Sequence, residues 1–368
     1  MEEEGIEVSS GSNSASTQAE LYGWSSKHRA QHVAVVGATG AVGLELLDIL
    51  VAAGHDPARV HSFARGPGKL TVRGTDFAVK PHTSADWKVC DVVFLCTPSD
   101  VSLALAHEIA AAGCHVIDLS SAFRMHPDVP LVVPEINGDV LARSGKLIAN
   151  PNCTTAIACM PLAVIEAVAG LAEVILVSFQ AASGAGVPGL NALKWEMRDA
   201  TGAAQTSSRA PSPFAATLAL NVIPAIADVG PNGVSGEEQK VIDETRKILR
   251  RPDLVVEVTT TRVPVERCHS VAVHVKTQRD FDLADLIAKL TAAPGLSVTH
   301  DPHGPRPREC AGQDDVSVGR IRAGMRGDRS LCFFAVGDQI RKGAALNALQ
   351  VAARLIPSDS SRKRGASA

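Results

Sequence analysis

Cys153 is the residue of this chain best placed for nucleophilic chemistry. Pro151 and Asn152 precede it and favour a tight turn, and an apolar run that predicts a helix begins at Thr154. A helix dipole stabilises negative charge at its N-terminus, so we expect this thiol to have a lowered pKa and to react as a thiolate. The alternative is a buried, inert cysteine, the more frequent fate of a cysteine in a folded protein.

Three glycines form a second pattern with chemical meaning. Gly37, Gly40 and Gly43 lie between an apolar run at 32–36, which predicts a buried strand, and a run at 44–53, which predicts a helix. In this setting backbone N–H groups and the helix N-terminus can bind a pyrophosphate. The alternative is a strand-to-helix turn without a ligand, because the spacing G-x-x-G-x-x-G is not the commoner G-x-G-x-x-G.

The residues after the next predicted strand, at 60–64, bear on the type of dinucleotide. NAD-selective sites place a carboxylate near this point, where it binds the ribose 2′-hydroxyl. Here Arg65 and Lys69 follow instead, and both suit a 2′-phosphate, although an ordinary solvated loop is the alternative. The sequence therefore favours NADP over NAD, and a thiol beside a nicotinamide suggests hydride transfer through a covalent thioester.

The predicted elements give an α/β fold of two domains. Strands at 91–96 and 114–119 flank a helix at 101–112, so residues 31–152 predict a Rossmann-type, doubly wound parallel sheet. Residues 153–337 predict a second, α+β domain for catalysis and dimerisation, with a long Gly/Ala/Ser/Pro-rich loop at 181–213. A C-terminal helix within 338–357 completes the first domain. Residues 1–30 and 358–368 are expected to be disordered.

Composition excludes several classes of protein. The 368 residues carry a net charge of -3 and only 4% aromatic residues, which disfavours nucleic-acid binding. No apolar run approaches the length that a membrane span needs. The eight cysteines contain no C-x-x-C pair and no zinc spacing, so we expect no metal and a reducing, cytoplasmic location, with an organelle as the alternative.

Taken in order, a series of motifs resembles the aspartate-semialdehyde dehydrogenase family from about residue 33 to 355. The motifs are 37–43 (GATGAVG), 118–125 (DLSSAFRM), 132–137 (VVPEIN), 150–155 (NPNCTT), 179–186 (FQAASGAG), 221–224 (NVIP), 237–240 (EEQK), 262–265 (RVPV), 268–270 (CHS) and 343–347 (GAALN). Several are loose alone, but their order is specific. One departure is Phe63-Ala64-Arg65-Gly66, which lacks the two hydroxyls that the family often has at the 2′-phosphate.

The resemblance implies three catalytic residues. Cys153 matches the nucleophile, Gln180 the residue that orients the substrate at the thiol, and His269 the acid/base. A neutral imidazole suits this last role because its ordinary pKa lies near neutrality. Without the resemblance, a histidine at the start of a strand is more often an ordinary core residue.

The resemblance also implies the ligands of the substrate's charged groups. Arg262 matches the ligand of the α-carboxylate, and Glu237 the partner of the amino group. Arg124, Asn152 and Lys240 match the phosphate site. The alternatives are a structural ion pair for Arg262 and a surface salt bridge between Glu237 and Lys240, which are three residues apart.

The remaining implications concern the cofactor and the reaction. The cofactor-binding positions would be Gly37, Thr39, Gly40, Ala41, Val42, Gly43, Arg65, Ser183, Gly184 and Asn347. The expected activity is the reversible, NADP-dependent reductive dephosphorylation of 4-phospho-L-aspartate to L-aspartate 4-semialdehyde, which feeds lysine, methionine and threonine synthesis, in a homodimer or homotetramer. The alternatives are N-acetyl-gamma-glutamyl-phosphate reductase, whose cysteine motif resembles Asn–Pro–Gly–Cys–Tyr, and a non-catalytic homologue that acts as a binding protein.

Overall fold

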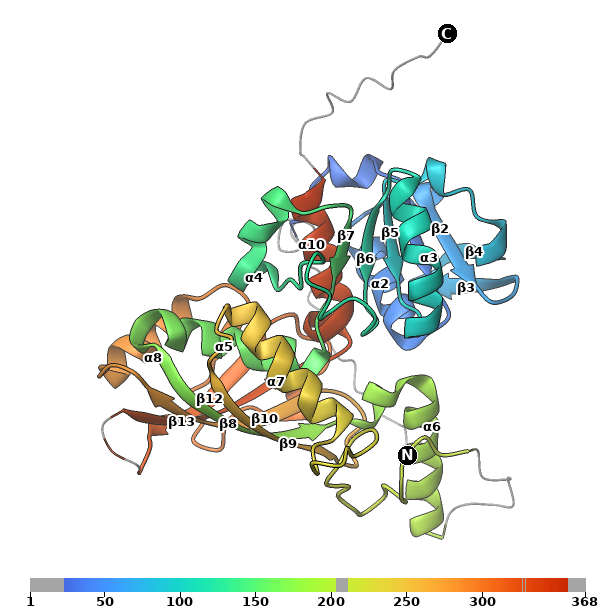
Figure 1. The fold of residues 1–368 in the computed structure, drawn as a ribbon. Helices are drawn as coiled ribbons and strands as arrows, with labels where there is room; N and C mark the ends of the chain where they lie inside the picture. Colours follow the sequence, from blue (N-terminus) through green and yellow to red (C-terminus); the bar gives the residue numbers. More distant parts are fainter. Residues whose placement is uncertain (1–22, 203–210, 326, 328, 357–368) are drawn as a thin grey trace, which may run out of the picture.

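A computed structural model describes residues 23–202, 211–325, 327 and 329–356, which form two β-sheets with their own helices (Figure 1). The first sheet has seven strands in the order β3-β4-β2-β1-β5-β6-β7. All neighbours are parallel except β3 and β4. The strands are β1 (Val33–Val36), β2 (Val60–Ala64), β3 (Gly68–Val72), β4 (Thr75–Pro81), β5 (Val92–Leu95), β6 (His115–Asp118) and β7 (Leu147–Ala149).

The strand order of this sheet reverses at β1. Because β1 pairs with β2 on one side and with β5 on the other, their carboxyl ends mark the point at which such sheets bind ligands. The helices of this part are α2 (Ala41–Ala52), α3 (Ser99–Ala111) and α4 (Pro134–Asn137), with 3₁₀ turns η1 (His28–Ala30), η2 (Pro57–Arg59), η3 (His82–Ser84), η4 (Trp87–Val89) and η5 (Gly138–Arg143).

The second sheet has six strands in the order β11-β12-β13-β10-β8-β9 and is mixed. Its strands are β8 (Leu171–Gln180), β9 (Val255–Arg262), β10 (His269–Thr277), β11 (Leu296–Val298), β12 (Val316–Ala323) and β13 (Ser330–Gly337). The helices are α5 (Cys153–Ala169), η6 (Ala182–Ala185), α6 (Gly186–Ala200), α7 (Gly236–Leu249), α8 (Leu283–Ala292) and α9 (Pro307–Cys310). Of these, α5, α7 and α8 pack against the sheet on one face (Figure 1).

Strand β1 is buried on both faces, as its unbroken apolar sequence predicts. Val33 and Val35 belong to a core cluster that also holds residues of α2 and α10 (Leu346–Leu355). Ala34 and Val36 point to the other face, whose cluster continues through α5 into the second sheet. The last described segment, the π-helix η7 (Arg341–Ala345) followed by α10, therefore returns to the first sheet.

The predicted disorder of residues 1–30 is wrong for residues 23–30. The Trp24 side chain is fully buried and donates a hydrogen bond from Nε1 to Nδ1 of His55 at 3.1 Å. His28 donates from Nε2 to the carbonyl of Ala353 at 3.0 Å. This segment thus packs against α10, a contact 325 residues away along the chain. Residues 1–22 and the predicted C-terminal tail at 358–368 lie outside the described residues.

The predicted loop at 181–213 is also wrong in part, because α6 occupies Gly186–Ala200. Pro188 stands in its first turn, where a missing N–H costs no helix hydrogen bond. Residues 203–210 are outside the described part of the chain. Over the ranges that are described, none of the helices combines the length and apolarity that crossing a membrane would require.

Candidate active site

Cys153 is the first residue of α5, and the turn before it holds the helix end in place. The Asn152 side chain caps the helix, since its Oδ1 accepts the N–H groups of Thr154 at 2.9 Å and Thr155 at 3.1 Å. Gly343 of η7 lies against the cysteine, and a Cβ there would stand 2.8 Å from the Cβ of Cys153. Only a glycine allows this approach, so the returning chain forms one wall beside the thiol.

The expectation of a lowered thiol pKa is wrong for the free protein. Burial, and next the negative charge of Glu237, raise the pKa of Cys153 to about 11. Arg124 and Arg262 act in the opposite direction, as does the N–H of Thr154, but they do not outweigh the loss of hydration. The thiol is therefore protonated at neutral pH, and it must lose its proton before it can attack.

His269, the first residue of β10, is a fully buried imidazole with one open nitrogen. Its Nδ1 accepts the N–H of Ala181 at 3.1 Å, so in the neutral ring the proton lies on Nε2. Nε2 has no hydrogen-bond partner among the described residues. Burial, and next the charge of Arg262, hold the pKa of His269 well below its ordinary value. The ring is neutral at physiological pH, and its Nε2–H is a donor without a hydrogen-bond partner among the described residues.

Arg262, at the end of β9, lies beside this histidine. A Cβ on Gly184 would come within 2.7 Å of Arg262 Nη1 and 3.0 Å of His269 Cε1, so both side chains converge on that glycine. The guanidinium is buried, donates from Nη1 to the carbonyl of Ala181 at 2.6 Å, and lies 5.9 Å from the ring centre of Phe214. Within the described ranges it makes no ion pair with a carboxylate, which leaves a buried positive charge open to an anionic ligand.

Glu237, in the first turn of α7, contacts three of the other predicted site residues through its carboxylate. Its Oε1 accepts from Asn152 Nδ2 at 2.8 Å and Gln180 Nε2 at 3.1 Å, and its Oε2 lies 3.4 Å from Lys240 Nζ. Burial alone would raise the pKa of Glu237, but Lys240 and the two amides outweigh it and hold the pKa below its ordinary value. Glu237 is therefore a buried carboxylate anion.

Arg124 is less open than the sequence suggested. It donates to Glu244 Oε1 at 3.0 Å and to the carbonyls of Asn150 and Leu119, so three of its five N–H groups are in use. Glu244 Oε2 in turn accepts the N–H of Asn152 at 2.6 Å. The buried pair holds the turn before Cys153, whereas the Lys240 side chain, 39% exposed, presents its charge to solvent.

Glu244 was missed by sequence reasoning, although a signal for it existed. Glu237, Lys240 and Glu244 are spaced at i, i+3 and i+7 and so share one face of α7. The first two were recognised as site residues. A third charged residue on that face could have been taken as part of the same site.

The glycine loop has the geometry that a pyrophosphate needs. Gly37 has a φ of 85°, and a Cβ there would collide with the carbonyl oxygen of Cys96. Gly40 caps α2, and both Thr39 and Gly40 are exposed. The first N–H groups of the helix, which have no acceptor within it, belong to Ala41, Val42 and Gly43. The residues therefore fit a dinucleotide whose phosphates lie on the helix N-terminus.

Arg65 lies beside this loop, because the carbonyl of Phe63 at the end of β2 accepts the N–H groups of Gly37 and Ala38. The Arg65 side chain is exposed and has no hydrogen bond or ion pair with any described residue. Lys69 differs, since its ammonium lies 2.7 Å from Asp76 Oδ2. Arg65 is thus the better-placed cation for a 2′-phosphate.

Two of the predicted cofactor ligands have other partners. The Ser183 hydroxyl donates to the carbonyl of Glu266 and accepts from Gln339 Nε2 at 2.6 Å. Asn347 is fully buried and uses both amide hydrogens, toward the carbonyl of Val132 and Asn150 Oδ1. These side chains hold the fold together in this structure, and their role as cofactor ligands stays a prediction. Gly184, in contrast, is exposed.

A thiol that can hold an acyl group next to a glycine cradle for a dinucleotide defines a class of enzyme, the nicotinamide-dependent oxidoreductases that work through a cysteine. Across the described ranges, no three His, Cys, Asp or Glu side chains gather as a metal site.

Comparison with known proteins gives the particular family. Residues 32–144 match the model of the semialdehyde dehydrogenase NAD binding domain, and residues 162–342 match that of the semialdehyde dehydrogenase dimerisation domain. The aspartate-semialdehyde dehydrogenase of Synechocystis is 38% identical over 88% of this chain and 97% of its own length. That of Bacillus subtilis is 36% identical over 89% of this chain and 98% of its own length. The chain belongs to the aspartate-semialdehyde dehydrogenase family.

The solved structures agree with this assignment. Aspartate semialdehyde dehydrogenase II from Vibrio cholerae, complexed with ASA, superposes with a TM-score of 0.83 at 32% identity, over 88% of this chain and 98% of that one. The predicted family, the fold class, the enzymatic nature and the nicotinamide dinucleotide cofactor are therefore confirmed. The match to a dimerisation domain also supports association of the chain with itself.

Proposed function

We propose that this enzyme catalyses the reversible, NADP-dependent reductive dephosphorylation of 4-phospho-L-aspartate to L-aspartate 4-semialdehyde, for the synthesis of lysine, methionine and threonine. The observation that carries the proposal is the meeting of three groups. Cys153 lies at a helix start, and the unpaired Arg262 is close enough to influence it electrostatically. Arg262 in turn converges with the buried, open Nε2 of His269 on Gly184.

The substrate has three charged groups, and the site offers a partner for each. We assign its α-carboxylate to Arg262, whose planar guanidinium can bind both oxygens and fix their orientation. Its ammonium is assigned to Glu237, which is buried and anionic. The phosphate is assigned to Lys240, which presents its charge to solvent near Glu237. Gln180, held by Glu237, orients the carbonyl at the thiol.

The reaction proceeds through bonds to the Cys153 sulfur. The thiolate attacks the acyl carbon, the bond to phosphate breaks, and a thioester remains. A dinucleotide held on the glycine loop at Gly37, Gly40 and Gly43 would supply the hydride that reduces the thioester carbon. The C–S bond of the resulting thiohemiacetal then breaks, which releases the aldehyde and returns the thiolate.

His269 is assigned the proton transfers of this sequence. In the resting arrangement its Nε2–H can donate a hydrogen bond to the negative oxygen of the thiohemiacetal. The Cys153 thiol, with a pKa of about 11, must lose a proton earlier in the cycle. The ring can accept that proton on Nε2 only as the Nδ1–H tautomer. In that tautomer Nδ1 no longer accepts the N–H of Ala181, so this hydrogen bond must break between the two stages.

NADP is proposed over NAD because Arg65 follows β2 where a carboxylate would mark an NAD site. The guanidinium is unpaired among the described residues and lies at the edge of the glycine loop. A 2′-phosphate would be its natural partner.

A homodimer is the proposed assembly, with a homotetramer as the alternative. The face of the second sheet opposite α5 carries Ile175, Val177, Phe179 and Phe334, which are half-buried in the single chain. The rings of Phe179 and Phe334 are 6.2 Å apart, so they form a continuous apolar patch that a second copy could cover. Light scattering coupled to size exclusion should give twice the chain mass, or four times for the alternative.

A cytoplasmic location is also proposed. All eight cysteines lie among the described residues, and all eight are free, as expected in a reducing compartment. Labelling of the free thiols in the protein taken directly from cells should give eight per chain.

The central test is a phosphate-dependent assay of NADP⁺ reduction. L-aspartate 4-semialdehyde should be oxidised only when phosphate is present, and N-acetyl-glutamate semialdehyde should be a far poorer substrate. A preference for the acetylated compound would identify the enzyme as an N-acetyl-gamma-glutamyl-phosphate reductase. An absence of turnover with both would favour a non-catalytic homologue.

A further inference from the structure

Glu45 links the cofactor-binding helix to the catalytic part of the chain. It stands five residues after Gly40, the cap of α2, and its side chain is only 12% exposed. Its Oε2 accepts from Arg267 Nη2 at 2.8 Å, and its Oε1 accepts from Arg341 Nη1 at 2.8 Å. One carboxylate on the first domain thus binds two arginines at the ends of strands of the second sheet. Arg267 precedes β10, and Arg341 follows β13.

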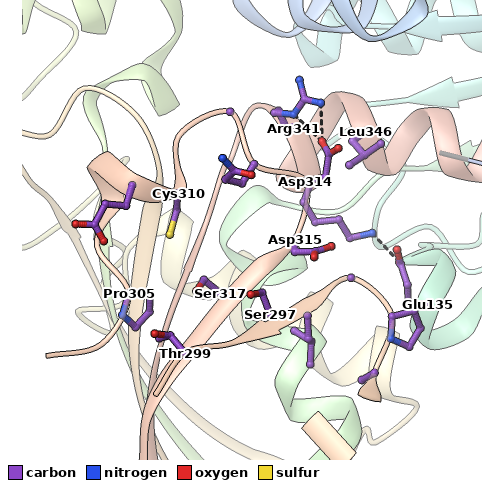
Figure 2. A pocket seen from close by; sticks show the side chains of 18 of the residues that line it. Glu135, Ser297, Thr299, Pro305, Cys310, Asp314, Asp315, Ser317, Arg341 and Leu346 are labelled. Atoms are coloured by element: carbon purple, nitrogen blue, oxygen red, sulfur yellow. Dashed lines mark hydrogen bonds and ion pairs between the residues drawn. The ribbon is translucent and has the colours of Figure 1, made fainter. Parts of the chain in front are cut away.

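Both arginines are fixed at their other side. Arg267 Nε donates to Asp338 Oδ2 at 2.6 Å. Arg341 Nε donates to Asp314 Oδ1 at 2.7 Å (Figure 2). Asp338 is completely buried and also accepts the N–H of Gly312 at 2.7 Å. Charge-assisted bonds of this kind are stronger and more directional than neutral ones, so the orientation of each guanidinium is well defined.

The network ends next to the catalytic histidine. Arg267 precedes His269 by two residues, and Cys268 between them has a φ of 75°, which a residue with a side chain seldom adopts. The N–H of Cys268 donates to Gln339 Oε1 at 2.7 Å, which holds this backbone in place. A shift of Arg267 would therefore be passed directly to the imidazole.

Apolar contacts also hold α2, because Leu46 and Leu47 share a core cluster with Ala345 of η7. Arg341 and Asp314 border a cavity of about 980 Å³, lined by Arg73, Glu135 and Leu346 of the first part of the fold and by the loops around β11 and β12 (Figure 2). Because this cavity separates the two parts here, contacts at its border must set their relative position. The ion pairs of Glu45 cross at its edge, and the ion pair of Lys342 Nζ with Glu135 Oε2, at 2.6 Å, lies in the same cavity (Figure 2).

We propose that Glu45 is a positioning residue, which sets helix α2, and the dinucleotide on its N-terminus, in register with His269 and Cys153. The inference rests on the proposed function and adds a residue to it that touches neither substrate nor cofactor. Without this link the dinucleotide still binds to the glycine loop, but its nicotinamide no longer lies in line with the Cys153 thioester. Small misplacements of this kind lower the rate of transfer strongly.

The test compares Glu45→Gln with a matched control on the same helix. Asp48 also holds an arginine through two bonds, from Arg73 Nε at 2.7 Å and Nη2 at 3.0 Å, but that pair stays within the first domain. Asp48→Asn therefore removes an equivalent charge without touching the link. Four quantities are measured: the Kd of NADP⁺, the rate of Cys153 alkylation by iodoacetamide with and without saturating NADP⁺, the kcat, and the primary isotope effect with deuterated NADPH.

Glu45→Gln should change the Kd of NADP⁺ by less than about threefold, because the phosphate cradle is intact. Saturating NADP⁺ should protect Cys153 in the wild type and in Asp48→Asn, and much less in Glu45→Gln. The kcat should fall between about tenfold and about a hundredfold, with a larger isotope effect, since hydride transfer becomes slower than product release. Arg267→Lys cannot contact Glu45 and Asp338 together, so it should show the same changes as Glu45→Gln. It replaces Glu45→Gln in the test if that variant folds poorly.

Wild-type protection in both Glu45→Gln and Arg267→Lys, or an unchanged isotope effect with full kcat, would overturn the proposal. A wild type that NADP⁺ does not protect would overturn it as well. The alkylation measurement needs only thiol and cofactor. If the semialdehyde were not a substrate, the proposed function would fail while the role of Glu45 was still decided.

Discussion

Replacing Arg65 with alanine should separate the binding of NADP from that of NAD. The side chain is exposed and makes no hydrogen bond or ion pair with the described residues, so the free energy of unfolding should change by less than about 0.5 kcal/mol. Loss of one charge-assisted phosphate contact should cost about 1.5–3 kcal/mol. This corresponds to a rise of roughly ten- to 150-fold in the Kd of NADP⁺.

The assay is a titration of wild type and variant with each dinucleotide at low ionic strength, where an exposed charge acts most strongly. The Kd of NAD⁺ should stay within about twofold, because NAD⁺ has no phosphate at this position. Lys69→Ala is the matched control. Its ammonium is already paired with Asp76 at 2.7 Å, so its removal should leave both dissociation constants nearly unchanged.

An unchanged ratio of the two dissociation constants in Arg65→Ala would refute the reasoning, since the phosphate would then be held elsewhere. An equal loss in Arg65→Ala and Lys69→Ala would also refute it. That result would mean that the general positive potential of the loop attracts the phosphate, and not a contact with one guanidinium.

Three further predictions concern the thiol, the anion sites and acid stability. Cys153→Ala should abolish turnover while the melting temperature and the Kd of NADP⁺ are kept, and substantial residual turnover would exclude this sulfur as the nucleophile. Arg262→Lys should lower kcat, because an ammonium cannot orient the carboxylate as a guanidinium does, whereas Lys240→Ala should mainly raise the KM for phosphate. Steady-state kinetics with one substrate varied at a time separates the two, and an effect of Lys240→Ala on semialdehyde alone would contradict the assignment. Burial lowers the pKa of His55 to about 4, from 6.5 in the unfolded chain, so the unfolded state binds the extra proton and stability should fall as the pH drops from about 6.5 to about 4. The loss should reach at most about 3 kcal/mol, and in His55→Gln the unfolding free energy measured by tryptophan fluorescence should depend less on pH over this range.

The parts of the site that sequence could predict are local ones. The glycine loop and Cys153 each lie where a strand or turn meets a helix, and a few neighbouring residues are enough to define that geometry. The pKa of the thiol is different, because it depends on burial and on Glu237, which is 84 positions away along the chain. A helix dipole can be inferred from a pattern, but the desolvation that outweighs it cannot.

Residue types alone also did not distinguish side chains that could bind a ligand from side chains that only stabilise the fold. Asn152 and Arg124 have the chemistry of anion ligands, yet the first caps a helix and the second pairs with Glu244, 120 residues away. Similarly, nothing near Trp24 in the sequence shows that its partner is His55. Such pairs are set by the tertiary fold, so only the structure reveals which donors remain open.

The return of α10 to the first sheet has a consequence for synthesis on the ribosome. The strands of that sheet emerge first, yet Leu346 and Leu349 of α10 belong to the same core cluster as Val33 and Val35. The nascent first domain must therefore keep an apolar face uncovered while some 200 further residues are translated. During that time the second sheet can fold, but the cofactor domain closes only when the last helix is released. This order makes the earliest-made domain the last one to be completed, and it makes the newly synthesised chain a client for chaperones that shield apolar surfaces.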